Sequence, residues 1–235
     1  SREVIRMAKI LFVSYPHNPT TACVDIDFYK ELVDWGKGKE IILCSDLAYS
    51  DIVFDGYKAP SLLQAKGAKE GNCIEFHTCS KSYNMAGWRI GWAVGNAQIL
   101  RSLEKTKSYI DFGIFRAVQE AAIQALMGPQ DGVKETVEIY KRRRDLFVQG
   151  LGSIGWKVPC PKATFYIWAH IPPKFSALTS LEFSQLLVDE TGVVTAPGTG
   201  FGEYGEGYIR FALVEPEHRL KGAVKRIQQV LDRPS

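Results

Sequence analysis

The chain has 235 residues, of which 46% are hydrophobic and 23% charged. That length can bury one large core or two modest ones, and the composition predicts a soluble globular protein. The 29 basic and 26 acidic residues are interspersed and give a formal net charge of +3, so no basic block favours a nucleic acid or membrane partner. We interpret the one dense basic run, Lys141–Arg144, as the solvated face of a helix.

Cysteine and histidine spacing indicates neither a disulfide framework nor a metal site. The five cysteines show no CxxC spacing and their number is odd, so we expect reduced thiols in a cytoplasmic protein. We expect Cys79 to be a small buried side chain rather than a reactive thiol. The four histidines are scattered, without a metal-ligand pattern. No apolar run approaches the roughly 20 residues that span a bilayer.

The N-terminal stretch SREVIRMAKILFVS lacks the apolar region and cleavage site of a signal peptide. It enters a strand-like run almost at once, so we expect the chain to begin in the middle of a domain. Hydrophobic periodicity then predicts an alternation of short apolar strands and a helix. We expect strands at 9–14, 40–45, 73–78 and 88–94, and a helix at 25–36.

This alternation predicts a mostly parallel α/β sheet, and ligands bind such sheets beyond the carboxyl ends of the strands. Three successive strand ends lead to polar side chains. Asn18 follows the first strand, Asp46 and Tyr49 follow the second, and Lys81 follows the third. We therefore expect these side chains to converge on one pocket.

The second half of the chain predicts a different organisation. Residues 97–150 have apolar side chains at helical spacing, interrupted by Gly and Pro at 128–132. We therefore expect two domains, the second half of a large α/β domain at 1–128 and a small α+β domain at 129–235. For the small domain we predict strands at 156–159, 163–171, 193–198 and 207–214, and helices at 181–190 and 216–231.

The stretch TCSKSYNMAGWRIGW, Thr78 to Trp92, carries the most specific chemistry because it places Lys81 eight residues before Arg89. A lysine amine can bond an aldehyde while an arginine pairs with a phosphate of the same small molecule. This is the layout of a pyridoxal 5'-phosphate (PLP) site. The Thr78 and Ser80 hydroxyls complete a phosphate site with Arg89.

The other strand ends supply the remaining groups that PLP needs. Its ring nitrogen must stay protonated, which requires a carboxylate beside it, and Asp46 is the candidate. Tyr49 and the amide of Asn18 can hydrogen-bond the phenolic oxygen. Taken singly, these residues have ordinary structural explanations: a helix N-cap for Asp46, packing for Tyr49, a surface ion pair for Arg89 and a turn for Asn18.

The segments YPHNPT, DLAY and SKSYNMAGWRIG together resemble the fold type I aminotransferases of class I and II in order and spacing. The resemblance implies that Lys81 forms a Schiff base with PLP and then moves the proton between the substrate and the cofactor. It gives Asp46, Tyr49, Asn18, Thr78, Ser80 and Arg89 the roles described above. In the segment GYIRFAL, it assigns Arg210 to the substrate α-carboxylate, a residue that would otherwise be interpreted as a surface salt bridge.

The resemblance extends from about Ser14 to the C-terminus, and Thr78 stands where the family often has Ser. Family members carry a further upstream segment of well over a hundred residues, with a glycine-rich phosphate turn and an aromatic residue that stacks on the cofactor. They have active sites at a dimer interface, which implies a homodimer. We expect a cis Asn18–Pro19 bond, although only about 5% of X-Pro bonds are cis, because the resembled loop is tight.

Segments such as KATFYIW and TGVVTAPGTGFGEYGEGYIRFAL look most like bacterial LL-diaminopimelate aminotransferases. The implied reaction moves an amino group between LL-diaminopimelate and 2-oxoglutarate in lysine biosynthesis. An aspartate, alanine or broad-range aminotransferase is the main alternative, and a truncated, non-catalytic fragment is another. A PLP-binding transcription regulator is disfavoured because the chain has no basic recognition helix.

Overall fold

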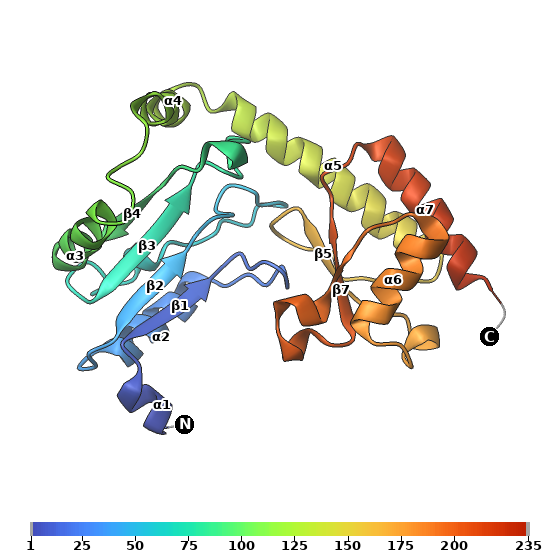
Figure 1. Cartoon of the computed structure of the whole chain (residues 1–235), viewed down its shortest axis with the longest axis horizontal. Coiled ribbons are helices and arrows are strands. Elements are labelled where there is room, and N and C mark those ends of the chain that lie inside the picture. The colour runs from blue at the N-terminus through green and yellow to red at the C-terminus, as the bar shows by residue number, and fades with distance from the viewer. Residues whose placement is uncertain (1, 234–235) are drawn as a thin grey trace. The chain divides into compact units, whose positions relative to one another are not determined.

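The computed structural model describes residues 2–233 and divides them into two compact units. The first unit comprises the chain up to His17 together with Ala22–Thr136. The second comprises Asn18–Thr21 and the chain from Val137 onward. Each unit contains its own β-sheet (Figure 1). The domain boundary between residues 128 and 129 remains a prediction.

The first unit combines a four-stranded sheet with α-helices and two short 3-10 helices. Long helix α5 begins in this unit and continues into the second. In chain order, the elements are α1 (Arg2–Met7), β1 (Ile10–Ser14), α2 (Ile26–Gly36), β2 (Ile42–Asp46), η1 (Leu62–Gln64), β3 (Cys73–Thr78), η2 (Ala86–Trp88), β4 (Gly91–Gly95), α3 (Ala97–Ser108), α4 (Arg116–Met127) and α5 (Asp131–Ser153).

The strands of this sheet run in the order β1-β2-β3-β4. β1 pairs parallel with β2 and β2 with β3, whereas β4 pairs antiparallel with β3. The predicted mostly parallel sheet is therefore confirmed. The register aligns Ser14 with Asp46 and Asp46 with Phe76, so the three parallel strands end at the same edge of the sheet.

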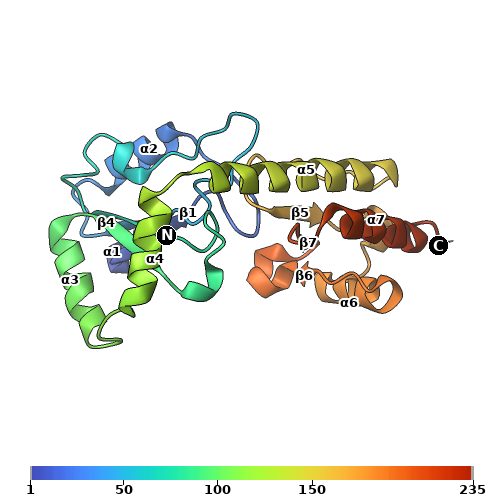
Figure 2. The same ribbon diagram turned by 90° about the horizontal axis from the view of Figure 1, so that it is seen from above.

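Helix α2 forms where the apolar spacing predicts it. Asp25 caps the helix, because its Oδ1 accepts the N–H groups of Asp27 and Phe28. Tyr29 and Val33 are buried in a cluster that also contains Leu43 of β2. α2 and α3 lie on opposite sides of the sheet (Figure 2).

The second unit contains a three-stranded antiparallel sheet in the order β5-β7-β6. In chain order, after α5, its elements are β5 (Tyr166–His170), η3 (Pro173–Phe175), α6 (Ser180–Thr191), β6 (Ala196–Pro197), η4 (Gly198–Phe201), η5 (Glu203–Gly205), β7 (Tyr208–Ala212) and α7 (Glu217–Leu231). The predicted helices of this half of the chain and three of its four predicted strands are confirmed, with boundaries shifted by a few residues.

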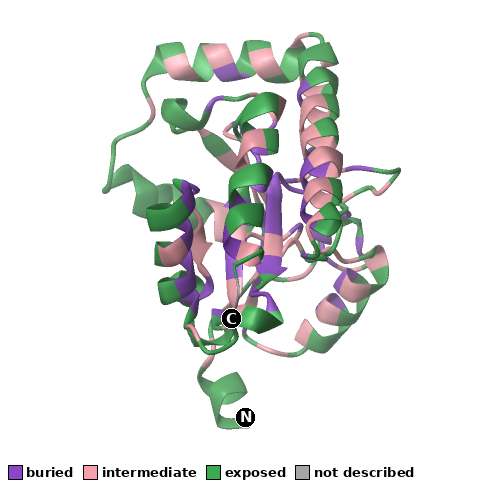
Figure 3. Ribbon diagram, turned by 90° about the vertical axis from the view of Figure 1, so that its right-hand side faces the viewer, coloured by how far each residue is buried: buried purple, intermediate pink, exposed green. Residues whose placement is uncertain are grey.

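Side chains alternate between the two faces of β5 and β7. Ile167, Ile209 and Phe211 point to one face and belong to a buried core with α5, α6 and α7 residues. Figure 3 shows buried positions on the strands and on one side of these helices. The other face of β7 carries Tyr208 and Arg210, so the strand pattern itself directs Arg210 away from the core.

The predicted strand at 156–159 is wrong, because these residues form no strand. Their apolar side chains pack in the core instead, with Trp156 buried and its indole N–H donating to the His170 carbonyl at 2.9 Å. Pro159 and Pro161 have no N–H with which to extend a ladder.

The predicted strand at 9–14 is confirmed as β1, and residues 2–7 form helix α1 before it, an element for which no prediction was made. The interpretation of the basic run as a solvated helix face is wrong for Arg144, which is only 2% exposed. Its guanidinium pairs with Asp145 and donates to the Pro161 carbonyl at 2.9 Å. A cationic side chain is buried here because it has hydrogen-bond partners.

The expected cis Asn18–Pro19 bond is confirmed, and the Tyr15–Pro16 bond is also cis. None of the five cysteines, which all lie within residues 2–233, forms a disulfide. Within residues 2–233, no helix is long and apolar enough to cross a membrane. The same residues contain no group of three or more His, Cys, Asp or Glu side chains that could hold a metal ion.

Candidate active site

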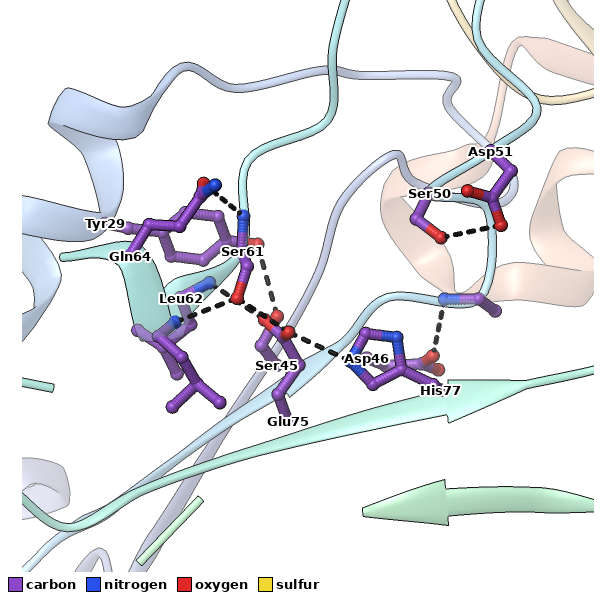
Figure 4. Close-up of polar contacts among 12 residues, drawn as sticks. Tyr29, Ser45, Asp46, Ser50, Asp51, Ser61, Leu62, Gln64, Glu75 and His77 are labelled. Atoms are coloured by element: carbon purple, nitrogen blue, oxygen red, sulfur yellow. Dashed lines mark hydrogen bonds and ion pairs between the residues drawn. The ribbon is translucent and has the colours of Figure 1, made fainter. Parts of the chain in front are cut away.

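The edge of the sheet where β2 ends presents a carboxylate and a buried phenol. Asp46 is the last residue of β2 and is exposed. Its Oδ1 accepts the Ala48 N–H at 3.2 Å, closing a tight turn (Figure 4). The segment that follows is a turn rather than a helix, so Asp46 is not a helix N-cap. Tyr49 is buried three residues further on.

Lys81 lies in the turn that follows β3, beside Tyr49. Its Nζ is 5.8 Å from the centroid of the Tyr49 ring. The next residue, Ser82, is buried and donates its hydroxyl to Asp51 Oδ2 at 2.5 Å. This hydrogen bond ties the Lys81 turn to the segment that carries Tyr49. The amine and the phenol are thus held together by two loops from neighbouring parallel strands.

Two hydroxyls lie just before Lys81. Thr78 Oγ1 is 2.9 Å from Ser80 Oγ and accepts the Ser80 N–H at 3.1 Å. Cys79 between them is fully buried, and burial raises the pKa of its thiol. A thiol that is kept protonated is a weak nucleophile, so Cys79 is the buried side chain that was expected.

Arg89 ends η2 in the left-handed backbone region, with φ of 54°. Such a conformation is uncommon for a residue other than glycine and is enriched at functional sites. The side chain is exposed, and its Nη1 donates to the Ala86 carbonyl at 2.9 Å. No ion pair of Arg89 is found among the described residues, so its exposed guanidinium can receive an anion.

A buried carboxylate in the middle of β3 supports this edge and was missed in the sequence. Glu75 is 1% exposed and accepts hydrogen bonds from Ser61 Oγ at 2.8 Å and Leu62 N at 2.8 Å (Figure 4). Its Oε1 is also 3.0 Å from His77 Nε2. The His77 ring stacks on Trp92 of β4, 5.3 Å away. The sequence signal that could have identified Glu75 was the presence of a glutamate inside a segment predicted to be an apolar strand.

In the second unit, the structure brings Asn18 and Arg210 together. Arg210 Nη1 donates to Asn18 Oδ1 at 2.6 Å. The guanidinium carbon lies 4.3 Å from the Tyr166 ring centroid and 4.7 Å from that of Phe201. Nε of Arg210 is buried and has no hydrogen-bond partner among the described residues. A buried donor without a partner costs about 1–3 kcal/mol, a cost that a bound carboxylate would remove.

The predicted site residues therefore fall into two groups. The first unit holds Asp46, Tyr49, Thr78, Ser80, Lys81 and Arg89 on neighbouring strand ends and the connection between β3 and β4. The second unit holds Asn18 and Arg210 in direct contact. The first group combines an amine, a carboxylate, a phenol and hydroxyls with an exposed guanidinium. This donor set fits a small aromatic aldehyde that carries a phosphate, and PLP is such a molecule.

The sequence matches the family described as aminotransferase class I and II over residues 3–227. The chain therefore belongs to the class I and II aminotransferases, a PLP-dependent family. This finding confirms the family resemblance and the fold class. It also places the chain among proteins that use small-molecule amino acids and 2-oxo acids.

The chain is 48% identical to the LL-diaminopimelate aminotransferase of Moorella thermoacetica over 229 residues, 97% of this chain and 58% of that protein. It is 47% identical to the glutamate-pyruvate aminotransferase AlaC of Escherichia coli over 227 residues, 97% of this chain and 55% of that protein. The substrate-bound structure of BacF from Bacillus subtilis superimposes with a TM-score of 0.94 at 37% identity, covering 100% of this chain and 58% of that one. The chain thus spans little more than half the length of these proteins.

Proposed function

We propose that this chain belongs to a PLP-dependent aminotransferase that moves an amino group from an L-amino acid to a 2-oxo acid. The proposed substrates are LL-diaminopimelate and 2-oxoglutarate, in lysine biosynthesis. The observation that carries the proposal is the position of Lys81 beside Tyr49, at the carboxyl ends of parallel strands, in a chain 48% identical to an LL-diaminopimelate aminotransferase.

In this proposal, Lys81 bonds the cofactor aldehyde and afterwards acts as the base and acid for the substrate Cα proton. PLP, when bound, supplies the electron sink that makes this proton acidic. Asp46 is exposed at its strand end, where a carboxylate can keep the cofactor ring nitrogen protonated. Tyr49 and Asn18 hydrogen-bond the phenolic oxygen.

The phosphate is assigned to Thr78, Ser80 and Arg89. The two hydroxyls lie 2.9 Å apart, so they can donate to neighbouring phosphate oxygens. Arg89 adds a charge that is permanent at neutral pH and a planar donor pair that matches phosphate geometry. These three side chains orient the cofactor and leave its aldehyde end to Lys81.

Arg210 is assigned to the α-carboxylate of the substrate, with Asn18 beside it. Arginine binds carboxylates through two parallel N–H···O bonds. The buried, unpaired Nε supports this assignment because an arriving carboxylate can supply the missing acceptor. We also propose a homodimer, as the family resemblance implies, that works in the cytoplasm and has no nucleic acid or membrane partner.

Lys81→Ala tests the assignment of the cofactor lysine. Borohydride reduction of the PLP-loaded protein should fix the cofactor on the peptide that contains Lys81, as read by mass spectrometry. Lys81→Ala should abolish this label and lower transamination by at least about 10³-fold, with an unchanged unfolding midpoint. Lys66→Ala, an exposed lysine in the same unit, is the matched control and should keep both. Label at another lysine would refute the assignment.

The amino donor is tested by comparing LL-diaminopimelate with L-alanine, each at fixed 2-oxoglutarate. A higher kcat/KM for LL-diaminopimelate supports the proposed substrate. A higher value for L-alanine or L-aspartate would favour a broad-range enzyme, in line with the similarity to AlaC. PLP binding without transamination of any amino acid would favour a non-catalytic fragment.

A further inference from the structure

The outer face of the second sheet carries a row of aromatic rings around Arg210. Trp168 pairs with Arg210 in the strand register and lies on the same face. Its ring stacks on Tyr208, with centroids 5.2 Å apart, and meets the edge of Phe201 at 6.0 Å. The rings therefore form a connected row, and Arg210 lies at one end of it.

Arg210 is held by three contacts of two kinds, two with aromatic rings and one hydrogen bond. The guanidinium carbon lies within 5 Å of both the Tyr166 and the Phe201 ring centroids, and Nη1 donates to Asn18. Cations favour the faces of aromatic rings, and the hydrogen bond fixes rotation about the long side chain. Together these contacts restrict an otherwise flexible side chain before any ligand arrives.

Phe201 lies in the 3-10 helix η4, and contacts with neighbouring elements fix the position of this helix. The backbones of η4 and η5 are in direct contact. A Cβ at Gly198 would lie only 1.8 Å from the Gly205 carbonyl oxygen, so only glycine fits there. Thr199 Oγ1 is 3.1 Å from Ser180 Oγ. Glu206 accepts the Ser180 N–H at 2.7 Å, which anchors the end of the turn to α6.

We infer that Tyr166 and Phe201 are positioning residues that act through Arg210 by holding its guanidinium in a fixed orientation for a carboxylate. The inference rests on the proposed role of Arg210 in binding the α-carboxylate. Contact with the two rings uses none of the guanidinium N–H groups as a conventional hydrogen-bond donor, and Nε still lacks an acceptor among the described residues. Because the side chain is ordered in advance, carboxylate binding loses less conformational entropy.

The first experiment reads the geometry directly and needs no cofactor. In the full chain, aromatic ring faces should shift the Nε–H resonance of Arg210 upfield in a ¹H–¹⁵N spectrum. Phe201→Leu should reduce this shift, and Phe201→Tyr should restore it. Tyr204→Leu is the matched control, because Tyr204 lies in the next turn and is 94% exposed. An ordinary shift in the wild-type chain would overturn the inference.

The second experiment measures function in the PLP-loaded chain with two probes. 2-Methylalanine has a carboxylate but no Cα proton, so it binds but cannot be transaminated. tert-Butylamine has a methyl group in place of the carboxylate and likewise has no Cα proton. Calorimetric titration should show that Phe201→Leu weakens the binding of 2-methylalanine by roughly 10-fold and leaves the binding of tert-butylamine unchanged. Phe201→Tyr should recover the affinity.

The remaining outcomes separate the inference from the proposed function. Arg210→Lys should weaken the binding of 2-methylalanine at least as much as Phe201→Leu does. If Arg210→Lys has no effect, the proposed role of Arg210 is wrong. If Arg210→Lys weakens binding but Phe201→Leu does not, only the positioning role is wrong. Equal weakening of both probes by Phe201→Leu would indicate general disruption and would also overturn the inference.

Discussion

The two units differ in how completely they cover their own apolar side chains. In the second unit, Ile167, Ile209 and Phe211 of β5 and β7 are buried in one core, and the exposed apolar side chains, such as Leu181, Val194 and Tyr204, lie outside these strands. In the first unit, Ile10 and Phe12 of β1 are more than half exposed, and so are Val4 and Met7 of α1. Further large apolar side chains are exposed from the end of α3 to α4: Tyr109, Ile110, Phe112, Phe115 and Met127.

This difference means that the proposed catalytic lysine and the proposed carboxylate-binding arginine lie in units whose apolar side chains are not equally well covered. Arg210 projects from a strand whose opposite face is fully packed. Lys81 follows β3, which lies inside its sheet, but the edge strand β1 is poorly covered. Large exposed apolar patches on soluble proteins mark surfaces that bind something. The first unit therefore has more exposed apolar surface that can bind a partner than the second unit has.

The largest predicted effect compares two phenylalanines on strands. Phe211 is 4% exposed in the second unit and Phe12 is 64% exposed in the first. Phe211→Ala should lower the free energy of unfolding by about 3–5 kcal/mol, because it leaves a cavity. Phe12→Ala should change it by less than about 1 kcal/mol. Urea unfolding measures both, and similar losses would contradict the contrast.

A smaller effect is expected at the buried carboxylate of the first unit. Glu75→Ala leaves the Leu62 N–H without its acceptor, so the free energy of unfolding should fall by about 1–3 kcal/mol. Glu75→Gln keeps one acceptor oxygen and should lose less. The amide protons of β3 should exchange faster with solvent in both variants. If Glu75→Ala is neutral, the first unit is even less dependent on its internal contacts than proposed.

The smallest effect concerns pH and the second unit. Hydrogen bonds from the Gly207 and Ser180 N–H groups lower the pKa of Glu206 below its ordinary value. The folded state therefore gains stability above the unfolded pKa, about 4.3, and loses it as pH falls through the folded pKa. Between pH 6 and pH 3, intrinsic-rate-corrected protection of the Ser180 amide should fall by less than about 10-fold.

Glu206→Gln is the control for this pH dependence. An amide cannot lose a proton in this range, so protection of Ser180 should become independent of pH between 6 and 3. A pH dependence that persists in Glu206→Gln would show that another carboxyl group is responsible. Glu182 also has a lowered pKa, caused mainly by the Thr179 N–H, and would be the next candidate.

The parts of the site that could be predicted lie where local sequence fixes both the strand and its end. Asp46 ends a short apolar run and Lys81 follows another, so parallel pairing alone places both at one edge. The tight YPHNPT turn could also be predicted from the sequence, and the expected cis Asn18–Pro19 bond is confirmed. The residue roles still await the experiments above.

The features that could not be predicted depend on partners far away in the chain. Nothing near Arg144 in sequence indicates that its guanidinium will meet the Pro161 carbonyl. Tyr166 contacts Arg210 only after β5 and β7 have paired, and Phe201, which follows β6, only after β6 has paired with β7. Glu75 needs Ser61 and Leu62 from a preceding loop. Periodicity describes one element at a time and carries no information about such pairs.

The hydrogen bond between Asn18 and Arg210 has a consequence for the order of folding. The two residues are 192 positions apart in the chain. Closing a loop of that size in a flexible chain costs roughly 5 kcal/mol of entropy, most of which must be offset by other contacts first. Contacts of such range form late. The clamp proposed for the carboxylate is thus expected to assemble after the Lys81 turn, and it brings with it Asn18, which is also proposed to bind the cofactor.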